Sequence, residues 1–416
     1  MENLIILSYI IFIFIVIESI CQIIIKFVNK KFQWLIIEKD EYPKFSDVGL
    51  KKFFQHGYDE ELGWIRKPKT SHKENGKEGM VEWHTNEKGA RVNPEFENKE
   101  SIISCYGDSF TFARQVSDDE TWEHYLSKLV NSNVQNFGVG NYGIDQSLIR
   151  MKREYPLNST KIVILAVVPD TISRIMSMWK HYYEYGNTFA FKPKFILENG
   201  NLKLINNQIN NKSKFNEYKK FLPEIKKYDY FYSKKFRKEK LHFPYFLTAI
   251  NNPKRSFGIV FRVILREIMK KNGKNVKKME WNLMKIIMEI NLKWRLKLFN
   301  DNNATKLLYE ILQEFVKFSE KNNFKPVFIF LPQKDDLIFI QNKYNFLEKF
   351  IIKINSLKKL NYIDIIKEFS EIQDLDFLYS DDNEYGGHFS KEGNEKVAVI
   401  IQKKLNELGF LSEIEK

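Results

Sequence analysis

Two short segments carry residues that could cleave an ester bond. The first is Tyr106-Gly-Asp-Ser-Phe110, which directly follows an apolar run typical of a buried strand. A serine at the carboxyl end of a parallel strand lies where open α/β sheets bind ligands. A serine hydroxyl is a weak nucleophile until a base removes its proton. Ser109 is therefore a candidate nucleophile, although an isolated Gly-Asp-Ser is also typical of an ordinary polar turn.

The second segment offers the base. His388 stands in the glycine-rich stretch Tyr385-Gly-Gly-His388, just before a predicted last helix at 393–408. Of the seven histidines, only this one lies at an expected crossover loop. Imidazole can take the proton of a serine hydroxyl and later return it to the leaving group. An ordinary surface histidine is the alternative interpretation.

The elements that must position these residues alternate between strand and helix from residue 101 onward. This alternation predicts an α/β, flavodoxin-like three-layer sandwich with a five-stranded parallel sheet. The expected strands are Ile102–Tyr106, Val134–Phe137, Ile162–Val168, Val327–Leu331 and Tyr362–Asp364, and the expected helices are Trp122–Val130, Ile144–Tyr155, Leu337–Leu357 and Gly393–Leu408.

Taken together, the motifs resemble the SGNH/GDSL hydrolase family. Gly107-Asp-Ser109 matches its first block, and Asn136-Phe-Gly-Val-Gly-Asn-Tyr-Gly143 is similar to its second. Gly386-Gly-His388, followed by Ser390-x-x-Gly-Asn394, is similar to its last block. The turns at Leu62-Gly-Trp64 and Gly89-Ala-Arg91 look like those of membrane-anchored members associated with surface polysaccharides.

The resemblance implies a serine esterase or O-acyltransferase without a metal or cofactor. Ser109 would attack the acyl carbon and His388 would act as base. Backbone N–H groups of Ser109, Gly140 and Asn141 would form the oxyanion hole, which is often the largest catalytic contribution. The expected substrate is an acyl ester, most plausibly acetyl on a cell-surface polysaccharide. The rival interpretation is a non-catalytic glycan-binding or assembly protein on a degenerate SGNH scaffold.

Two departures from the family pattern motivate that rival. The place of the family's oxyanion asparagine reads Val167-Val-Pro-Asp170, which leaves Asn187 as a weak substitute. The family's Asp three residues before the histidine is replaced by Tyr385. We assign the orienting carboxylate to Asp382, because the two following glycines give the loop room to place it.

The flanking segments indicate a membrane protein with an insertion. Residues 1–32 contain an apolar run long enough to cross a bilayer, with Glu18 in its last third. Residues 33–97 read as an N-terminal β-rich extension, and 98–416 as the SGNH hydrolase-like domain with a basic helical insertion at about 180–300. The lysines that follow the apolar run favour a cytoplasmic globular part. The family association outweighs them, and we expect an extracytoplasmic location.

The formal net charge of +13 comes from one segment. Between Lys212 and Lys297 there are 24 basic and 7 acidic residues, so the rest of the chain is mildly acidic. We consider a solvated helical face and contact with an anionic membrane surface. A nucleic-acid partner is not expected, because no recognition motif accompanies the charge. Gly138-x-Gly-x-x-Gly143 also fits a dinucleotide fingerprint, but the acidic residue expected about 20 positions later is missing.

Overall fold

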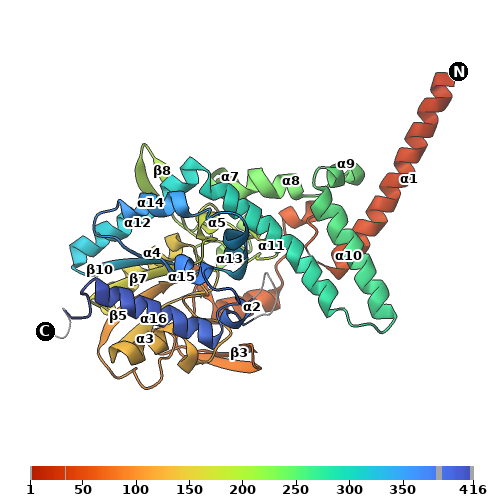
Figure 1. Ribbon diagram of the computed structural model, residues 1–416. Helices are drawn as coiled ribbons and strands as arrows, with labels where there is room; N and C mark the ends of the chain where they lie inside the picture. The colour runs from red at the N-terminus through yellow and green to blue at the C-terminus, as the bar shows by residue number, and fades with distance from the viewer. Residues whose placement is uncertain (1, 33, 381–386, 413–416) are drawn as a thin grey trace. The chain divides into compact units, whose positions relative to one another are not determined.

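The computed structural model describes residues 2–32, 34–380 and 387–412. Asp382 and Tyr385 therefore lie outside the described residues. The chain divides into two compact units, each assembled from segments that are distant in the sequence (Figure 1). The first unit comprises Met1–Asp47, Trp179–Ala190 and Glu217–Lys293, and the second comprises Val48–Met178, Phe191–Asn216 and Trp294–Lys416.

The second unit is built on a parallel five-stranded sheet with the order β11-β10-β7-β5-β6. Numbered by their own chain order, the strands run 2-1-3-4-5, which is the flavodoxin-like doubly wound arrangement. The predicted α/β fold is confirmed. The strands are β5 (Ser101–Gly107), β6 (Asn133–Asn136), β7 (Ile162–Val167), β10 (Lys325–Phe330) and β11 (Asn361–Ile363).

Helices cover both faces of this sheet (Figure 1). On one face α3 (Trp122–Val130) packs against α16 (Lys391–Glu407), and on the other α4 (Ile144–Glu154) packs against α12 (Asn302–Asn322). Every residue of β7 is buried. This explains the uninterrupted apolar run of that strand, because a central strand with two covered faces needs no polar alternation.

The predicted helix at 337–357 is wrong as a single element. The chain forms α13 (Lys334–Asn342) and α14 (Glu348–Asn355) instead. Lys343 leaves the helical region with φ −133° and ψ −86°, and the Asn345 side chain accepts a hydrogen bond from the Leu347 amide at 3.0 Å. Such an Asn turn competes with the helical hydrogen bonds and breaks the helix. A further helix, α15 (Ile365–Ser370), follows β11.

Small elements surround the sheet of the second unit. Three antiparallel hairpins are present in its described residues, and two of them precede β5. They are β1 (Tyr58–Asp59) with β2 (Gly63–Trp64), β3 (Ser71–Asn75) with β4 (Met80–His84), and β8 (Lys194–Glu198) with β9 (Asn201–Ile205); the helices are α2 (Asp47–His56) and α5 (Thr171–Arg174).

The first unit is helical. Its first helix, α1 (Glu2–Lys31), is long and apolar enough to cross a membrane. The last third of α1 packs on other helices of the unit around buried Ile25, Val28, Ile259 and Val263. The remaining helices are α6 (Lys180–Tyr183), α7 (Leu222–Tyr228), α8 (Arg237–Glu239), α9 (Tyr245–Ile250), α10 (Pro253–Lys271) and α11 (Lys277–Phe299), the last of which continues into the second unit.

Glu18 has a structural role within α1. Its side chain is buried, and its carboxylate accepts hydrogen bonds from the backbone amides of Tyr245 and Phe246, the latter at 3.0 Å. These amides begin α9 and have no partner inside that helix. The acidic residue in the apolar run therefore caps a second helix of the same unit.

Candidate active site

The loop after β5 places Ser109 at the point where the strand order reverses. β5 and β7 are neighbours, and the chain leaves their carboxyl ends toward opposite faces of the sheet. Doubly wound sheets bind ligands at this switch point. A Cβ on Gly107 would lie 1.8 Å from the carbonyl oxygen of Ala166, so only glycine fits there. Ser109 follows this close approach by two residues and is 8% exposed.

Asp108 supports the loop and does not act as the base. Its Oδ1 accepts from the Phe110 amide at 2.9 Å, and its Oδ2 accepts from the Val168 amide at 2.9 Å. Arg174 Nη1 donates to the same Oδ2 at 3.0 Å. Burial raises the pKa of Asp108, and the nearby Arg174 guanidinium opposes that rise. This carboxylate therefore ties the loop after β5 to the loop after β7.

His388 lies beside the serine loop. Its ring packs on Phe110, the residue after Ser109, with ring centroids 4.7 Å apart. Its Nδ1 is 2.9 Å from Gln115 Oε1. Among the described residues, no hydrogen bond joins the His388 ring to Ser109 Oγ. The structure thus brings both predicted residues to one loop cluster, with the ring fixed by a side chain that the sequence analysis did not select.

The partners of Gln115 determine the protonation of His388. Gln115 Oε1 also accepts from the His388 backbone N–H at 2.8 Å and from the Ser380 hydroxyl at 2.9 Å. A backbone N–H can only donate, so the atom facing it must be the amide oxygen. That oxygen can only accept from Nδ1, which must carry the proton. The Nε2 lone pair of the neutral ring is therefore available as a base.

Electrostatics keep the His388 ring neutral. Burial lowers its pKa to about 3, and the Arg114 guanidinium adds to this effect. Glu74 opposes the lowering, whereas Arg174 reinforces it. Glu74 is itself ion-paired with Arg114. The predicted orienting residue Asp382 lies outside the described residues, so Gln115 is the observed partner of Nδ1.

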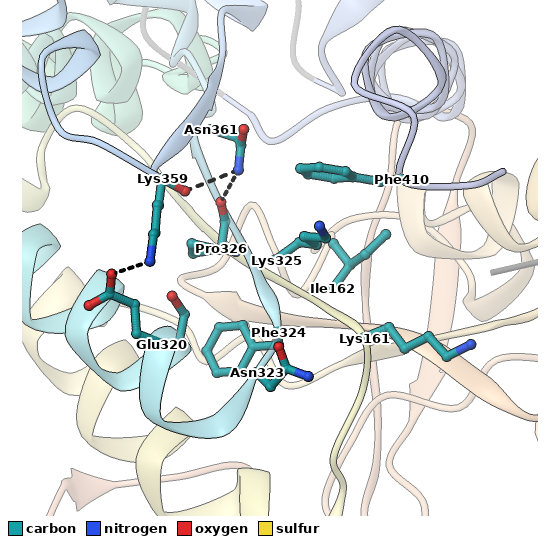
Figure 2. A pocket seen from close by; sticks show the side chains of 11 residues that line it. Lys161, Ile162, Glu320, Asn323, Phe324, Lys325, Pro326, Lys359, Asn361 and Phe410 are labelled. Atoms are coloured by element: carbon teal, nitrogen blue, oxygen red, sulfur yellow. Dashed lines mark hydrogen bonds and ion pairs between the residues drawn. The ribbon is translucent and has the colours of Figure 1, made fainter. Parts of the chain in front are cut away.

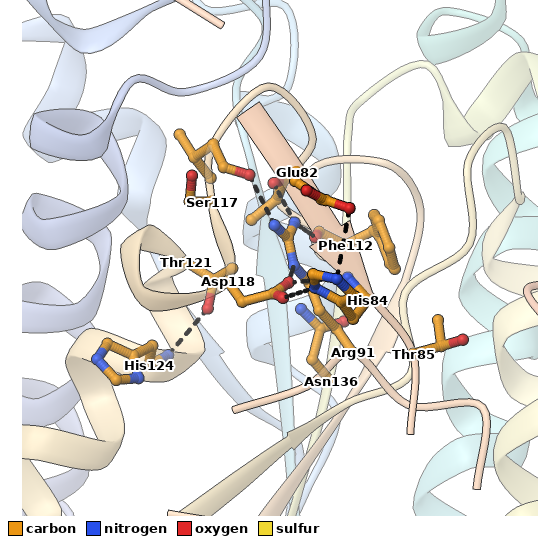
Figure 3. A network of polar contacts seen from close by, with 12 residues as sticks. Glu82, His84, Thr85, Arg91, Phe112, Ser117, Asp118, Thr121, His124 and Asn136 are labelled. Carbon is orange, nitrogen blue, oxygen red and sulfur yellow. Dashed lines mark hydrogen bonds and ion pairs between the residues drawn. The ribbon is translucent and has the colours of Figure 1, made fainter. Parts of the chain in front are cut away.

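A buried arginine holds the loop that carries Gln115 (Figure 3). Ala113 and Gln115 have φ values of 53° and 69°, which are uncommon for residues with a side chain. The Gln115 amide donates to Glu74 at 3.2 Å. The Arg91 guanidinium donates to one carboxylate and three carbonyl oxygens of the loop: Asp118 at 2.9 Å, Phe112 at 2.7 Å, Ala113 at 2.6 Å and Val116 at 2.6 Å.

The loop after β6 brings the predicted oxyanion donors next to Ser109. A Cβ on Gly140 would lie 3.9 Å from Ser109 Cβ. The Gly140 carbonyl accepts from Trp64 Nε1 at 2.9 Å, and Asn141 has a φ of 69°. Within the described part of the chain, no hydrogen bond occupies the backbone N–H of Ser109, Gly140 or Asn141. All three amides are thus available to a ligand.

The short helix after β7 supplies an arginine to the site. Arg174 Nη1 donates to the Tyr142 carbonyl at 2.9 Å as well as to Asp108, and its Nε donates to Asp170 at 3.3 Å. Asn187 belongs to the first unit, where its side-chain amide donates to the Glu184 carbonyl at 3.0 Å.

A cleft of about 750 Å³ lies at the amino ends of the sheet strands, opposite the ends that carry Ser109. It is lined by residues at the amino ends of β7, β10 and β11, including Ile162, Lys325 and Asn361 (Figure 2). Lys359 and Glu320 form an ion pair of 2.7 Å in its wall. Ser109 and His388 are at the carboxyl ends, so this cleft is separate from the candidate active site.

No protein-family model and no curated protein sequence matches this chain. Similar solved structures include a lipolytic protein of the G-D-S-L family from Desulfitobacterium hafniense, at 11% identity and a TM-score of 0.32, covering 73% of this chain and 98% of that one. A lipase/acylhydrolase from Enterococcus faecalis is 12% identical with a TM-score of 0.33, covering 74% and 95%. A G-D-S-L family member from Veillonella parvula is 10% identical with a TM-score of 0.28, covering 74% and 97%.

The strand order and the positions of the serine, glycine-rich and histidine loops identify the architecture of the second unit. The second unit has a flavodoxin-like α/β fold. In this unit the serine loop follows the first sheet strand, the glycine-rich loop follows the second, and the histidine precedes the last helix. Gln115 carried no sequence signal, because it lies in a loop of irregular conformation and meets His388 only through the fold.

Proposed function

We propose that this protein is a serine esterase or O-acyltransferase with Ser109 as nucleophile and His388 as base. The observation that carries the proposal is the fixed tautomer of His388, whose Nε2 is available next to the serine loop. Free backbone amides at Ser109, Gly140 and Asn141 support it. They are the donors that an acyl-transfer transition state requires.

The proposed reaction has two halves. Ser109 Oγ attacks the acyl carbon while its proton passes to His388 Nε2. The bond from the acyl carbon to the leaving oxygen breaks, and His388 returns the proton to that oxygen. A water or a sugar hydroxyl then attacks the acyl-serine, again losing its proton to His388, and Ser109 is restored. Gln115 acts as a positioning residue that keeps Nε2 unprotonated.

The proposed substrate is an acetyl ester on a cell-surface polysaccharide, and the proposed location is the outer side of a membrane. The turns that resemble membrane-anchored family members support the substrate. The apolar helix α1 supports the anchor. We further propose that the basic first unit contacts the membrane surface beside α1, because α9 and α10 expose Leu247, Phe257 and Phe261.

A non-catalytic glycan-binding role is the second candidate. The neutral Gln115 favours it, since a carboxylate in that place would stabilise the imidazolium ion formed during catalysis. Reaction with a fluorophosphonate probe separates the two functions. We expect the full chain in detergent to be labelled at Ser109 and to release 4-nitrophenol from 4-nitrophenyl acetate. Ser109→Ala should abolish both signals. Absence of labelling between pH 5 and 9 would favour the binding protein.

A further inference from the structure

Arg66 is a cation held close to the candidate nucleophile. Its guanidinium carbon lies 4.3 Å from the centroid of the Trp83 ring and 4.6 Å from that of Phe112. These rings meet edge to face, at 86° and 4.9 Å. Contacts with two aromatic faces fix the orientation of a guanidinium group without using its N–H donors.

The donors of Arg66 have no acceptor among the residues that the structure describes. Among residues 2–32, 34–380 and 387–412, its guanidinium forms neither a hydrogen bond nor an ion pair. Burial lowers the pKa of Arg66 to about 10, which leaves it charged at neutral pH. None of its nitrogen atoms is among the buried unpartnered atoms of the described residues, so they can donate to a ligand that enters from solvent.

The position of Arg66 relates it to the reaction. The Cβ position of Gly140 is 3.9 Å from Arg66 Nη2 and 3.9 Å from Ser109 Cβ. The two distances add to 7.8 Å, so Nη2 lies no farther than that from Ser109 Cβ. An anionic group on a substrate bound to Ser109 and to the Gly140 amide can therefore reach this guanidinium.

The charges around Arg66 favour an anion. Arg114, Arg91 and Arg150 all act on it as like charges, and Glu74 is the opposing carboxylate. Three nearby carboxylates already have cationic partners other than Arg66. These pairs are Glu74 with Arg114, Asp118 with Arg91, and Asp108 with Arg174.

We infer that Arg66 is a specificity-determining residue that binds an anionic group of the ester substrate, so that the preferred substrate is an acylated acidic sugar. The inference rests on the proposed function, because it places the anion next to the ester that Ser109 attacks. A uronic acid carboxylate fits best, since it can accept two parallel N–H bonds from a guanidinium group. The carboxylate binds in the ground state and in the transition state alike, so its effect belongs mainly to KM.

The test compares O-acetyl galacturonic acid with O-acetyl galactose, which differ in one carboxylate. We expect the full chain to favour the uronate by about tenfold or more in kcat/KM, an effect of about 1.4 kcal/mol. Arg66→Gln should remove this preference through KM and leave 4-nitrophenyl acetate hydrolysis within about threefold. Arg153→Gln is the matched control, because that arginine already has a carboxylate partner, Asp59, at 3.0 Å.

Two results would overturn the inference. An equal loss on all three esters would assign Arg66 to the oxyanion, and an unchanged uronate preference would exclude it from recognition. Binding measured by calorimetry separates this inference from the proposed function. Ser109→Ala should bind galacturonic acid, and adding Arg66→Gln should weaken that binding by about tenfold even if the protein hydrolyses no ester. Thermal unfolding of each variant checks that it is folded.

Discussion

Replacing Gln115 by glutamate tests whether this side chain controls the catalytic base. The substitution keeps the size of the side chain and places a carboxylate oxygen where Oε1 now lies, 2.9 Å from Nδ1 of His388. The three hydrogen atoms that point at this oxygen, from Nδ1, the His388 amide and the Ser380 hydroxyl, remain suitable donors. Only the charge of the acceptor changes.

The expected effect follows from Coulomb's law. Two unit charges about 4 Å apart interact by about 4 kcal/mol at an effective dielectric constant of 20. One pKa unit corresponds to about 1.4 kcal/mol, so the imidazolium form gains the equivalent of about three units. The pKa of His388 should rise from about 3 to about 6. Because the raised pKa favours the protonated ring, the free base is lost below about pH 6 in the variant.

The measurement is kcat/KM against pH with 4-nitrophenyl acetate. We expect a flat profile for the natural chain from pH 5 to pH 8, and an acidic limb near pH 6 for Gln115→Glu. Above pH 7 the variant should be faster by about tenfold or more, because the carboxylate stabilises the imidazolium formed in the transition state. Gln341→Glu is the control. It adds the same charge in α13, where the side chain donates to the Ser370 carbonyl, and should leave the pH profile flat. Superimposable profiles for Gln115→Glu and the natural chain would refute the assignment.

Other substitutions probe the supports of the site and of the first unit. Gly138→Ala should cost about 1–3 kcal/mol of unfolding free energy in denaturant titrations, because its Cβ would lie 2.2 Å from the Phe112 amide nitrogen. Arg91→Met should cost about 3–5 kcal/mol, since it leaves buried Asp118 without its cation, and equal stability would contradict the network. Glu18→Ala should speed hydrogen exchange of the first amides of α9, whereas unchanged exchange would exclude the cap. Burial alone would raise the pKa of Glu41, yet hydrogen bonds from lysines and a tyrosine lower it to about 2. The stability that this carboxylate contributes above pH 4.5 should therefore be lost as the pH falls toward 2. Glu41→Gln should remove that part of an acid-unfolding curve.

The sheet could be predicted because three of its strands, β5, β7 and β10, read as apolar runs that alternate with helical patterns. β7 is the clearest case, with every residue buried between two helical layers. The break between α13 and α14 could not be predicted in the same way. The apolar spacing continues through it, and only the side-chain hydrogen bond of Asn345 to the backbone stops the helix.

Only those residues of the candidate site could be predicted whose side chains are typical of acyl-transfer catalysis. Ser109 could be selected because it follows a predicted strand, and His388 because it stands in a glycine-rich stretch before the last helix. Gln115 and Arg66 could not, since their roles depend on neighbours that the fold supplies: the ring of His388 in one case, and the rings of Trp83 and Phe112 in the other. Neither contact leaves a local pattern in the sequence.

The ion pairs of the folded chain change how its net charge is interpreted. Part of the basic insertion is balanced inside the first unit, where buried Glu239 contacts Lys235 at 3.2 Å and Arg255 at 3.1 Å. The second unit carries only a small part of the net charge, yet Arg114, Arg91 and Arg150 all act on Arg66 as like charges. A neutral Gln115 is consistent with this field, since the surrounding arginines keep His388 in its basic form. Formal charge counted along the chain therefore locates the basic insertion, whereas the charge near Ser109 and His388 comes from a few arginines whose positions are set by the fold.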